Sequence, residues 1–143
     1  MTTPLDDHAP QAGARRCADA RPLKVLVLDD EPMILMDLVF SLEDLGAVAL
    51  DARSVADALG WIEREPPDVA ILDVNLGRGA TCKPVAERLR AMGVPFLLHS
   101  GDLDRQGVGV ASMSAPIVPK PTPGHIVIRR ALDLVQREDN ADR

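Results

Sequence analysis

The sequence predicts an α/β fold in which a doubly wound, five-stranded parallel sheet carries helices on both faces. Short apolar runs recur five times, and most of the segments between them show helical spacing of apolar residues. Alternation of this kind is typical of βαβ units. The runs are continuous rather than interrupted by polar residues, which indicates strands buried on both faces. With 143 residues, 46% of them apolar, the chain is long enough for one domain with an ordinary core.

The expected strands are aliphatic runs bounded by turn residues. Aromatic side chains are limited to Phe40, Trp61 and Phe96, so the core has to be built from aliphatic residues. In chain order, the five strands are expected at Val25–Leu28, Ala47–Leu50, Val69–Leu72, Val94–Leu98 and Ile117–Val118.

The first two helices are expected after the first two strands. Apolar residues at helical spacing run from Ile34 to Leu45, and Gly46 follows as a stop signal. The second helix is expected to begin at Ser54, which can form a capping pair with Asp57. The residues that it is expected to bury are Val55, Leu59 and Ile62.

Two further helices have clear signals. One aligns Val85, Leu89 and Met92 on a single face before Gly93. The last helix is expected to open at Thr122-Pro123, an N-cap followed by proline at the first helical position. The residues that it is expected to bury are Val127, Ala131 and Leu134.

The fourth helix of the series, Asp102–Ser114, is expected to be weak. Gly107 and Gly109 interrupt it, and each glycine costs a helix about 1 kcal/mol relative to alanine. We expect its folded form to be close in free energy to alternative conformers. Residues 1–22 are expected to form a flexible tail, 23–138 the folded domain and 139–143 a C-terminal tail.

Composition argues against several classes of protein. A net charge of −6 with few aromatic residues is unlike a nucleic-acid-binding surface. The chain lacks the apolar region of a signal peptide and any run of 18 apolar residues that could span a membrane. Cys17 and Cys82 show no ligand or disulfide spacing, which favours free thiols in a reducing cytoplasm.

Polar residues stand at the carboxyl ends of four expected strands. The first strand runs into Asp29 and Asp30, the third into Asp73, the fourth into Ser100 and the fifth into Lys120. In open α/β sheets, ligands bind beyond the carboxyl ends of the strands, so these side chains should meet at one edge.

This set of residue types fits phosphoryl chemistry with magnesium. Mg²⁺ prefers oxygen ligands, so Asp30 and Asp73 could bind it directly, Asp29 through water, and a backbone carbonyl just past Asp73 could add a ligand. The cation would also relieve repulsion between the carboxylates. One carboxylate could act as a nucleophile toward phosphorus, while Lys120 and Ser100 balance charge on the transferring oxygens.

At these residues the chain resembles the receiver domain of bacterial two-component response regulators. The matching pieces are "LDDEP", "LDVNL", the Ser100-Gly101 pair and "PKP", and the resemblance covers residues 23–137 in order and spacing. It implies a flavodoxin-like strand order of 2-1-3-4-5. It also implies Mg²⁺ as cofactor, a sensor histidine kinase as phosphoryl donor, and possible transfer onward to a histidine phosphotransferase or another downstream protein. No chain remains for a DNA-binding output domain, so a stand-alone, single-domain regulator is expected.

The resemblance also implies a role for each site residue. Asp73 would be the phosphoacceptor, and Asp29 and Asp30 the acidic pair that holds the metal. Asn75 would supply a main-chain carbonyl to the metal. Ser100 would match the Thr/Ser switch, and Lys120 the lysine that family members carry at this place.

Two positions depart from the common pattern of that family. Ile117 stands where an aromatic switch residue is usual, and Thr122 where phenylalanine is frequent. With the fourth strand ending in Leu98 to Gly101, the chain is similar to the single-domain subgroup whose fourth strand reads Phe-Ala-Thr-Gly. A third departure is the fourth helix, which glycines interrupt. These departures bear on how a signal would leave the domain rather than on phosphorylation. Without an aromatic switch, we expect Asp102–Ser114 to carry the output signal by a shift in its population of conformers.

Two other function classes have to be weighed. A magnesium-dependent phosphatase or phosphotransferase with an aspartate nucleophile commonly has an acid two residues after the nucleophile, where this chain has Asn75. A flavodoxin-like binding module would need a phosphate loop after the first strand, where "DDEPMI" is acidic. His99 should point away from the Ser100 side of the sheet, and Met33 and Met36 are interpreted as packing residues.

Overall fold

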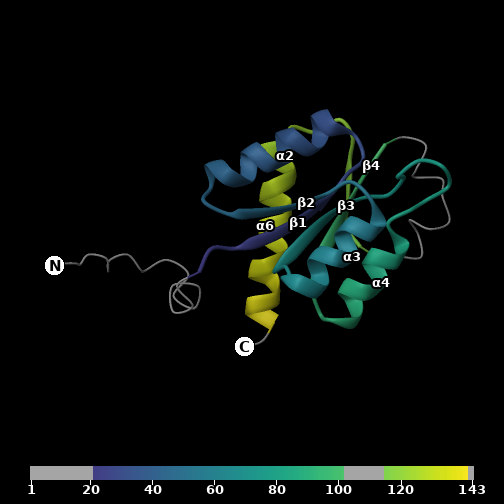
Figure 1. The fold of residues 1–143 in the computed structure, drawn as a ribbon. Helices are drawn as coiled ribbons and strands as arrows, with labels where there is room; N and C mark the ends of the chain where they lie inside the picture. Colours follow the sequence, from purple (N-terminus) through teal and green to yellow (C-terminus); the bar gives the residue numbers. More distant parts are fainter. Residues whose placement is uncertain (1–20, 102–114, 142–143) are drawn as a thin grey trace.

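The structure, a computed structural model, describes residues 21–101 and 115–141 of the chain. The strands within these ranges are β1 Lys24–Leu28, β2 Val48–Ala52, β3 Val69–Asp73, β4 Phe96–Ser100 and β5 Ile117–Pro119. The helices are α2 Pro32–Asp44, α3 Val55–Arg64, α4 Lys83–Ala91 and α6 Gly124–Ala141. Figure 1 shows them around a twisted sheet.

The five strands form one parallel sheet in the order β2-β1-β3-β4-β5, which confirms the predicted fold class and strand order. The two central pairs are β1 with β3, where Leu28 lies opposite Leu72, and β3 with β4, where Asp73 lies opposite His99. Because all strands run the same way, the residues that follow β1, β3 and β5 emerge at the same edge.

Two apolar layers cover the two faces of the sheet. Alternate residues of β1 separate them: Leu26 and Leu28 pack with α3 and α4, whereas Val25 and Val27 pack with α2 and α6. Figure 1 shows these two helix pairs on opposite sides of the sheet. All five residues of β3 are buried, as expected for the central strand of a doubly wound sheet.

The predicted cap of α3 is confirmed. The hydroxyl oxygen of Ser54 accepts a hydrogen bond from the backbone N–H of Asp57 at 3.1 Å. The stop signal after α2 is confirmed as well, since Gly46 has a positive φ of 78°, a conformation that glycine adopts at little cost.

The predicted start of the last helix was wrong. The helix α6 begins at Gly124, and the Thr122 hydroxyl donates a hydrogen bond to the carbonyl of Pro119 instead of capping it. The cap comes from another element: Asp37 of α2 accepts the backbone N–H of Gly124 at 3.0 Å. A contact between residues 87 positions apart carries no local sequence signal.

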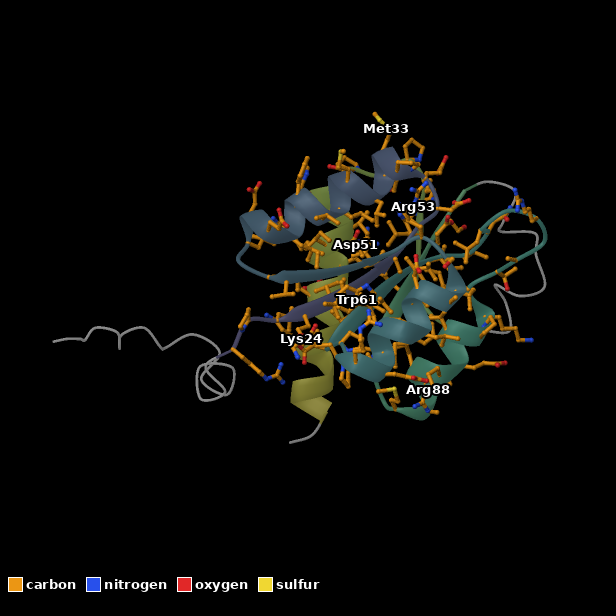
Figure 2. The ribbon with its side chains drawn as sticks, viewed as in Figure 1. Lys24, Met33, Asp51, Arg53, Trp61 and Arg88 are labelled. Carbon is orange, nitrogen blue, oxygen red and sulfur yellow. The ribbon has the colours of Figure 1, made fainter. Side chains whose placement is uncertain are left out.

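The interpretation of two methionines as packing residues was also wrong. Met33 is 81% exposed and Met36 is 51% exposed, because α2 buries its opposite side through Leu35, Leu38 and Leu42. Figure 2 shows Met33 projecting outward from the start of α2.

Several predictions fall on residues that the structure does not describe. The weak fourth helix at Asp102–Ser114, its role in output, Cys17, and all but the last two residues of the expected N-terminal tail lie outside the described ranges. The helix α6 continues past residue 138 to Ala141. No helix among the described residues is both long and apolar enough to cross a membrane.

Candidate functional site

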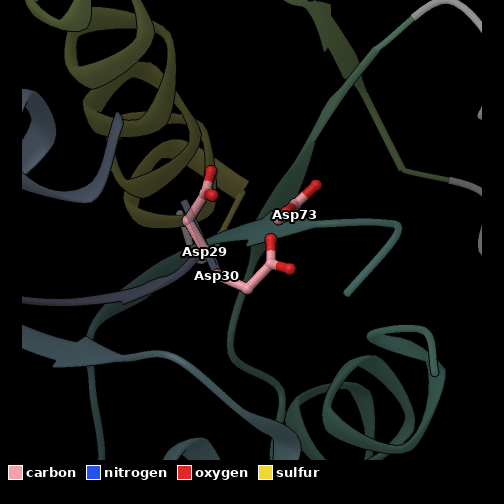
Figure 3. A group of neighbouring side chains, drawn as sticks. All are labelled: Asp29, Asp30 and Asp73. Atoms are coloured by element: carbon pink, nitrogen blue, oxygen red, sulfur yellow. The ribbon is translucent and has the colours of Figure 1, made fainter. Parts of the chain in front are cut away.

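Three carboxyl groups gather at the edge of the sheet where β1 and β3 end. Asp29, Asp30 and Asp73 each place an oxygen within 4.8 Å of the others. Figure 3 shows Asp29 and Asp30, consecutive residues after β1, beside Asp73 at the end of β3. Asp29 and Asp73 are buried, and Asp30 is half-buried. The sequence prediction that these residues meet at one edge is therefore reproduced in the structure.

Backbone hydrogen bonds fix the positions of these side chains. The N–H of Asp29 donates to the carbonyl of Ala52 at 3.1 Å, which extends the pairing of β1 with β2 by one residue. The Oδ1 of Asp29 then accepts the backbone N–H of Glu31 at 2.9 Å. Asp73 is the last residue of β3, so the central strand holds it directly.

Lys120 reaches this carboxyl cluster from the end of β5. Its backbone N–H donates to the carbonyl of Ser100 at 2.8 Å, and a cis peptide bond follows between Lys120 and Pro121. Its ammonium Nζ lies 3.2 Å from Oδ2 of Asp29 and 3.2 Å from Oδ1 of Asp73. The ammonium also donates to Oε1 of Glu31 at 3.3 Å.

Burial and like charge shift the ionisation of the cluster. Burial first, and the neighbouring Asp29 carboxylate second, raise the pKa of Asp73 to about 8, although Lys120 acts against this. Burial likewise raises the pKa of Asp29, opposed by the Glu31 N–H and Lys120. Burial alone would lower the pKa of Lys120, but Asp29 and Asp73 outweigh it and raise that pKa.

The cluster has the chemistry of a site for a hard divalent cation. All its donor atoms are carboxylate oxygens, the ligands that Mg²⁺ prefers. When all three carboxyl groups are ionised, the single ammonium of Lys120 leaves negative charge uncompensated among them. A divalent cation between the carboxylates would reverse the rise in the pKa of Asp73, because it favours the charged form.

The other predicted site residues use their side chains locally: Ser100 ends β4, the strand beside β3, and Asn75 follows β3. Ser100 is fully buried at the end of β4, and its hydroxyl donates to the carbonyl of Gly101 at 3.2 Å. The side-chain oxygen of Asn75 accepts the N–H of Gly77 at 3.0 Å, which shapes the loop after β3. The backbone hydrogen bonds of this loop use the carbonyls of Val74, Gly77 and Ala80.

His99 lies beneath a groove beside the cluster. It lines a cavity of about 820 Å³ with the apolar Ile34 and Leu38 of α2 and the loop from Lys120 to Pro123. Burial first and Lys120 second lower the pKa of His99 to about 4, so its ring is neutral at neutral pH. Both ring nitrogens are buried, and the residue acts in packing on the α2 side of the sheet.

Sequence reasoning missed Glu31 as a member of the site. The side chain of Glu31 is 59% exposed, yet it forms an ion pair with the ammonium of Lys120, which also contacts the two buried aspartates. The available signal was its place next to the acidic pair, at the start of a helix that it does not cap through its side chain.

Comparison with known proteins gives relatives in sequence and in structure, although no family model matches the chain. The probable transcriptional regulatory protein TcrX of Mycobacterium tuberculosis is 30% identical over 126 residues, which cover 85% of this chain and 53% of TcrX. The transcriptional regulatory protein KdpE of the same species is 46% identical over 52 residues, 23% of its length. The chain thus spans about half, or less, of the length of these curated relatives.

Among solved structures, SdrG from Sphingomonas melonis Fr1 is 34% identical, with a TM-score of 0.68 over 80% of this chain and 97% of SdrG. A response regulator receiver domain protein (CheY-like) from Methanospirillum hungatei JF-1 has a TM-score of 0.73 at 19% identity, over 85% of this chain and 99% of that one. The receiver domain of NtrX from Brucella abortus has a TM-score of 0.69 at 22% identity, over 78% and 98%. The latter two likenesses establish the shared fold.

Proposed function

The chain belongs to the receiver domains of response regulators, and from this premise we propose that it accepts a phosphoryl group on Asp73 with the help of Mg²⁺. One observation carries the proposal. A buried carboxyl group at the end of the central strand lies 3.2 Å from a lysine ammonium and within 4.8 Å of two further carboxyl groups. This arrangement supports the proposal, because it would bring a nucleophile, a counter-charge and a set of metal ligands together.

The donor in this proposal is the phosphohistidine of a sensor histidine kinase. A carboxylate oxygen of Asp73 attacks phosphorus and forms the new phosphorus–oxygen bond. The phosphorus–nitrogen bond of the donor breaks, and its electron pair stays on the imidazole, which leaves as the neutral ring when its other nitrogen carries a proton. Attack requires the ionised form of Asp73, which the raised pKa of the metal-free site disfavours.

The carboxylates of Asp29, Asp30 and Asp73 and the main-chain carbonyl of Asn75 would hold the Mg²⁺ ion. When bound, the ion favours ionised Asp73 and neutralises charge on the phosphoryl oxygens. Lys120 compensates charge on the other side of the same group, since its ammonium already lies beside Asp73.

Ser100 would respond to the phosphoryl group. Its hydroxyl donates to the neighbouring carbonyl of Gly101, and it can rotate to donate to a phosphoryl oxygen instead. We assign the output to contacts with other proteins, by signalling, by relay to a histidine phosphotransferase or by draining phosphate from a kinase. In the same proposal, the protein acts in the cytoplasm, where kinases have access to ATP, and does not bind nucleic acid.

Labelling of Asp73 tests this function. The wild-type protein should become phosphorylated in the presence of Mg²⁺ and either acetyl phosphate or a phosphorylated kinase, whereas Asp73→Asn should not label. The matched control is Asp51→Asn, because Asp51 is an exposed aspartate on the neighbouring strand β2. Phosphorylation of Asp73→Asn to the level of Asp51→Asn would exclude Asp73 as the acceptor.

A further inference from the structure

Glu31 differs from the other two carboxylates that contact Lys120. The ammonium of lysine has three N–H donors, and in this structure three carboxylates lie within 3.3 Å of it. The side chains of Asp29 and Asp73 are 1% and 3% exposed, but that of Glu31 is 59% exposed. Glu31 is therefore the partner that Lys120 can release most readily, since water can solvate the carboxylate that is left.

Within the part of the chain that the structure describes, the Glu31 side chain hydrogen-bonds to Lys120 and does not cap its own helix. It occupies the N-cap position of α2, but its side chain makes no capping hydrogen bond there. Its backbone does the local work, because the N–H donates to Asp29 and the carbonyl accepts from Leu35. The carboxylate itself accepts a hydrogen bond from the ammonium of Lys120, which lies 89 positions away in the chain.

From this arrangement, and resting on the proposed function, we propose that Glu31 is a latch that holds Lys120 and competes with the phosphoryl group for it. In the unphosphorylated protein, Glu31 accepts one N–H of the ammonium at the rim of the site. A phosphoryl group on Asp73 brings new acceptor oxygens to Lys120, and one N–H transfers from Glu31 to a phosphoryl oxygen. Glu31 is a positioning residue that lowers the affinity of the site for phosphoryl-like anions.

Beryllofluoride, an anionic mimic of a phosphoryl group, provides the test. Its affinity is measured by calorimetric titration of the full chain at saturating Mg²⁺ and fixed ionic strength. Glu31→Gln keeps the shape and one acceptor oxygen but removes the charge, so beryllofluoride should bind about two- to fivefold more tightly, the range that one exposed ion pair is worth. Glu31→Asp keeps the charge on a shorter side chain, so its beryllofluoride affinity should lie between those of Glu31→Gln and the wild type.

Two controls separate a latch from a general effect of charge. Glu43→Gln removes an exposed carboxylate near the other end of α2 and should leave beryllofluoride affinity unchanged. Mg²⁺ affinity, titrated without beryllofluoride, should change less than twofold in Glu31→Gln, because Glu31 is outside the three-carboxylate group. Weaker Mg²⁺ binding in step with tighter anion binding would indicate a simple field effect and overturn the latch.

The result also distinguishes this inference from the proposed function. If the wild-type protein binds no beryllofluoride at saturating Mg²⁺, the proposed phosphoryl site is wrong. If the wild-type protein binds it and Glu31→Gln binds it equally, the phosphoryl site stands and the latch is refuted.

Discussion

At the scale of single residues, Asp73 is a carboxyl group whose surroundings favour its protonated form when no cation is bound. Its pKa is raised from 3.8 to about 8, chiefly by burial and then by Asp29. Between about pH 4 and pH 8 the folded protein therefore holds a proton that the unfolded chain has lost. The free energy of unfolding of the metal-free protein should fall as pH rises through this window.

Asp73→Asn should remove the part of that pH dependence that Asp73 contributes, because the amide does not ionise. At pH 8 without divalent cation, we expect the variant to be more stable than the wild type by on the order of 1–3 kcal/mol. Lys120 keeps its contacts with Asp29 and Glu31 in the variant. Its own raised pKa adds stability that is lost only as pH rises above the usual lysine range, outside this window.

Urea denaturation across the pH range, in the presence of a chelator, measures the effect, with Asp51→Asn as the control. An Asp73→Asn protein whose stability followed the pH profile of the wild type would mean that another group holds the proton. Asp29 is the nearest alternative, since its pKa is also raised by burial.

At the scale of elements, the sequence predicted all five strands but not the start of one helix. The strands β2 and β4 each end two residues beyond the expected runs, at Ala52 and Ser100. Strand ends could be located because aliphatic runs stop abruptly at residues such as Asp73 and Lys120, and parallel strands bring their carboxyl ends to one edge. The start of α6 depended on Asp37, which lies on a helix far away in the chain. The Lys120–Glu31 pair was missed for the same reason.

The tie between α2 and α6 gives a prediction with an unusual sign. Replacing glycine by alanine near a helix start normally stabilises a protein slightly. A Cβ on Gly124, however, would lie 2.7 Å from the Oδ2 atom of Asp37, so Gly124→Ala should displace that carboxylate and lose the cap. We expect destabilisation of about 1–2 kcal/mol, the usual cost of a lost N-cap.

Gly60→Ala is the matched control. Gly60 lies within α3, and an added Cβ would meet only the end of the flexible Arg64 side chain at 3.2 Å. This change should stabilise the protein by up to about 1 kcal/mol in thermal or urea unfolding. Combining Gly124→Ala with Asp37→Ala should cost little more than either change alone, because both remove one cap. Additive losses would contradict the proposed tie.

At the scale of the whole molecule, the site joins parts of the chain that are far apart in sequence. Lys120, which follows β5, contacts the carboxylates of Asp29, after β1, and Asp73, at the end of β3. A change of charge in the site therefore acts on the ends of these three strands together. The sequence was sufficient to name the residues that assemble at this edge. It could not predict their pKa values, because these depend on how deeply each side chain is buried and on its distance from the neighbouring charges.

A ligand that binds the folded state alone stabilises the entire fold in proportion to the logarithm of its concentration. Mg²⁺ should therefore raise the unfolding temperature of the wild-type protein. The free energy of unfolding should rise by about 1.4 kcal/mol for each tenfold increase in Mg²⁺ concentration above the dissociation constant. Sodium chloride at equal ionic strength should not reproduce this rise, since screening acts weakly on buried carboxylates.

Asp30→Ala should abolish most of the Mg²⁺-dependent rise without unfolding the metal-free protein. Asp30 is half-buried and contributes one of the three clustered oxygens, and its removal leaves Asp29 and Asp73 in contact with Lys120. Without magnesium, the loss of one carboxylate from the cluster should leave the unfolding temperature equal or higher. Glu31→Gln serves as the charge-matched control and should keep the full response to Mg²⁺. An Asp30→Ala protein stabilised by Mg²⁺ as strongly as the wild type would place the cation outside the cluster of Asp29, Asp30 and Asp73.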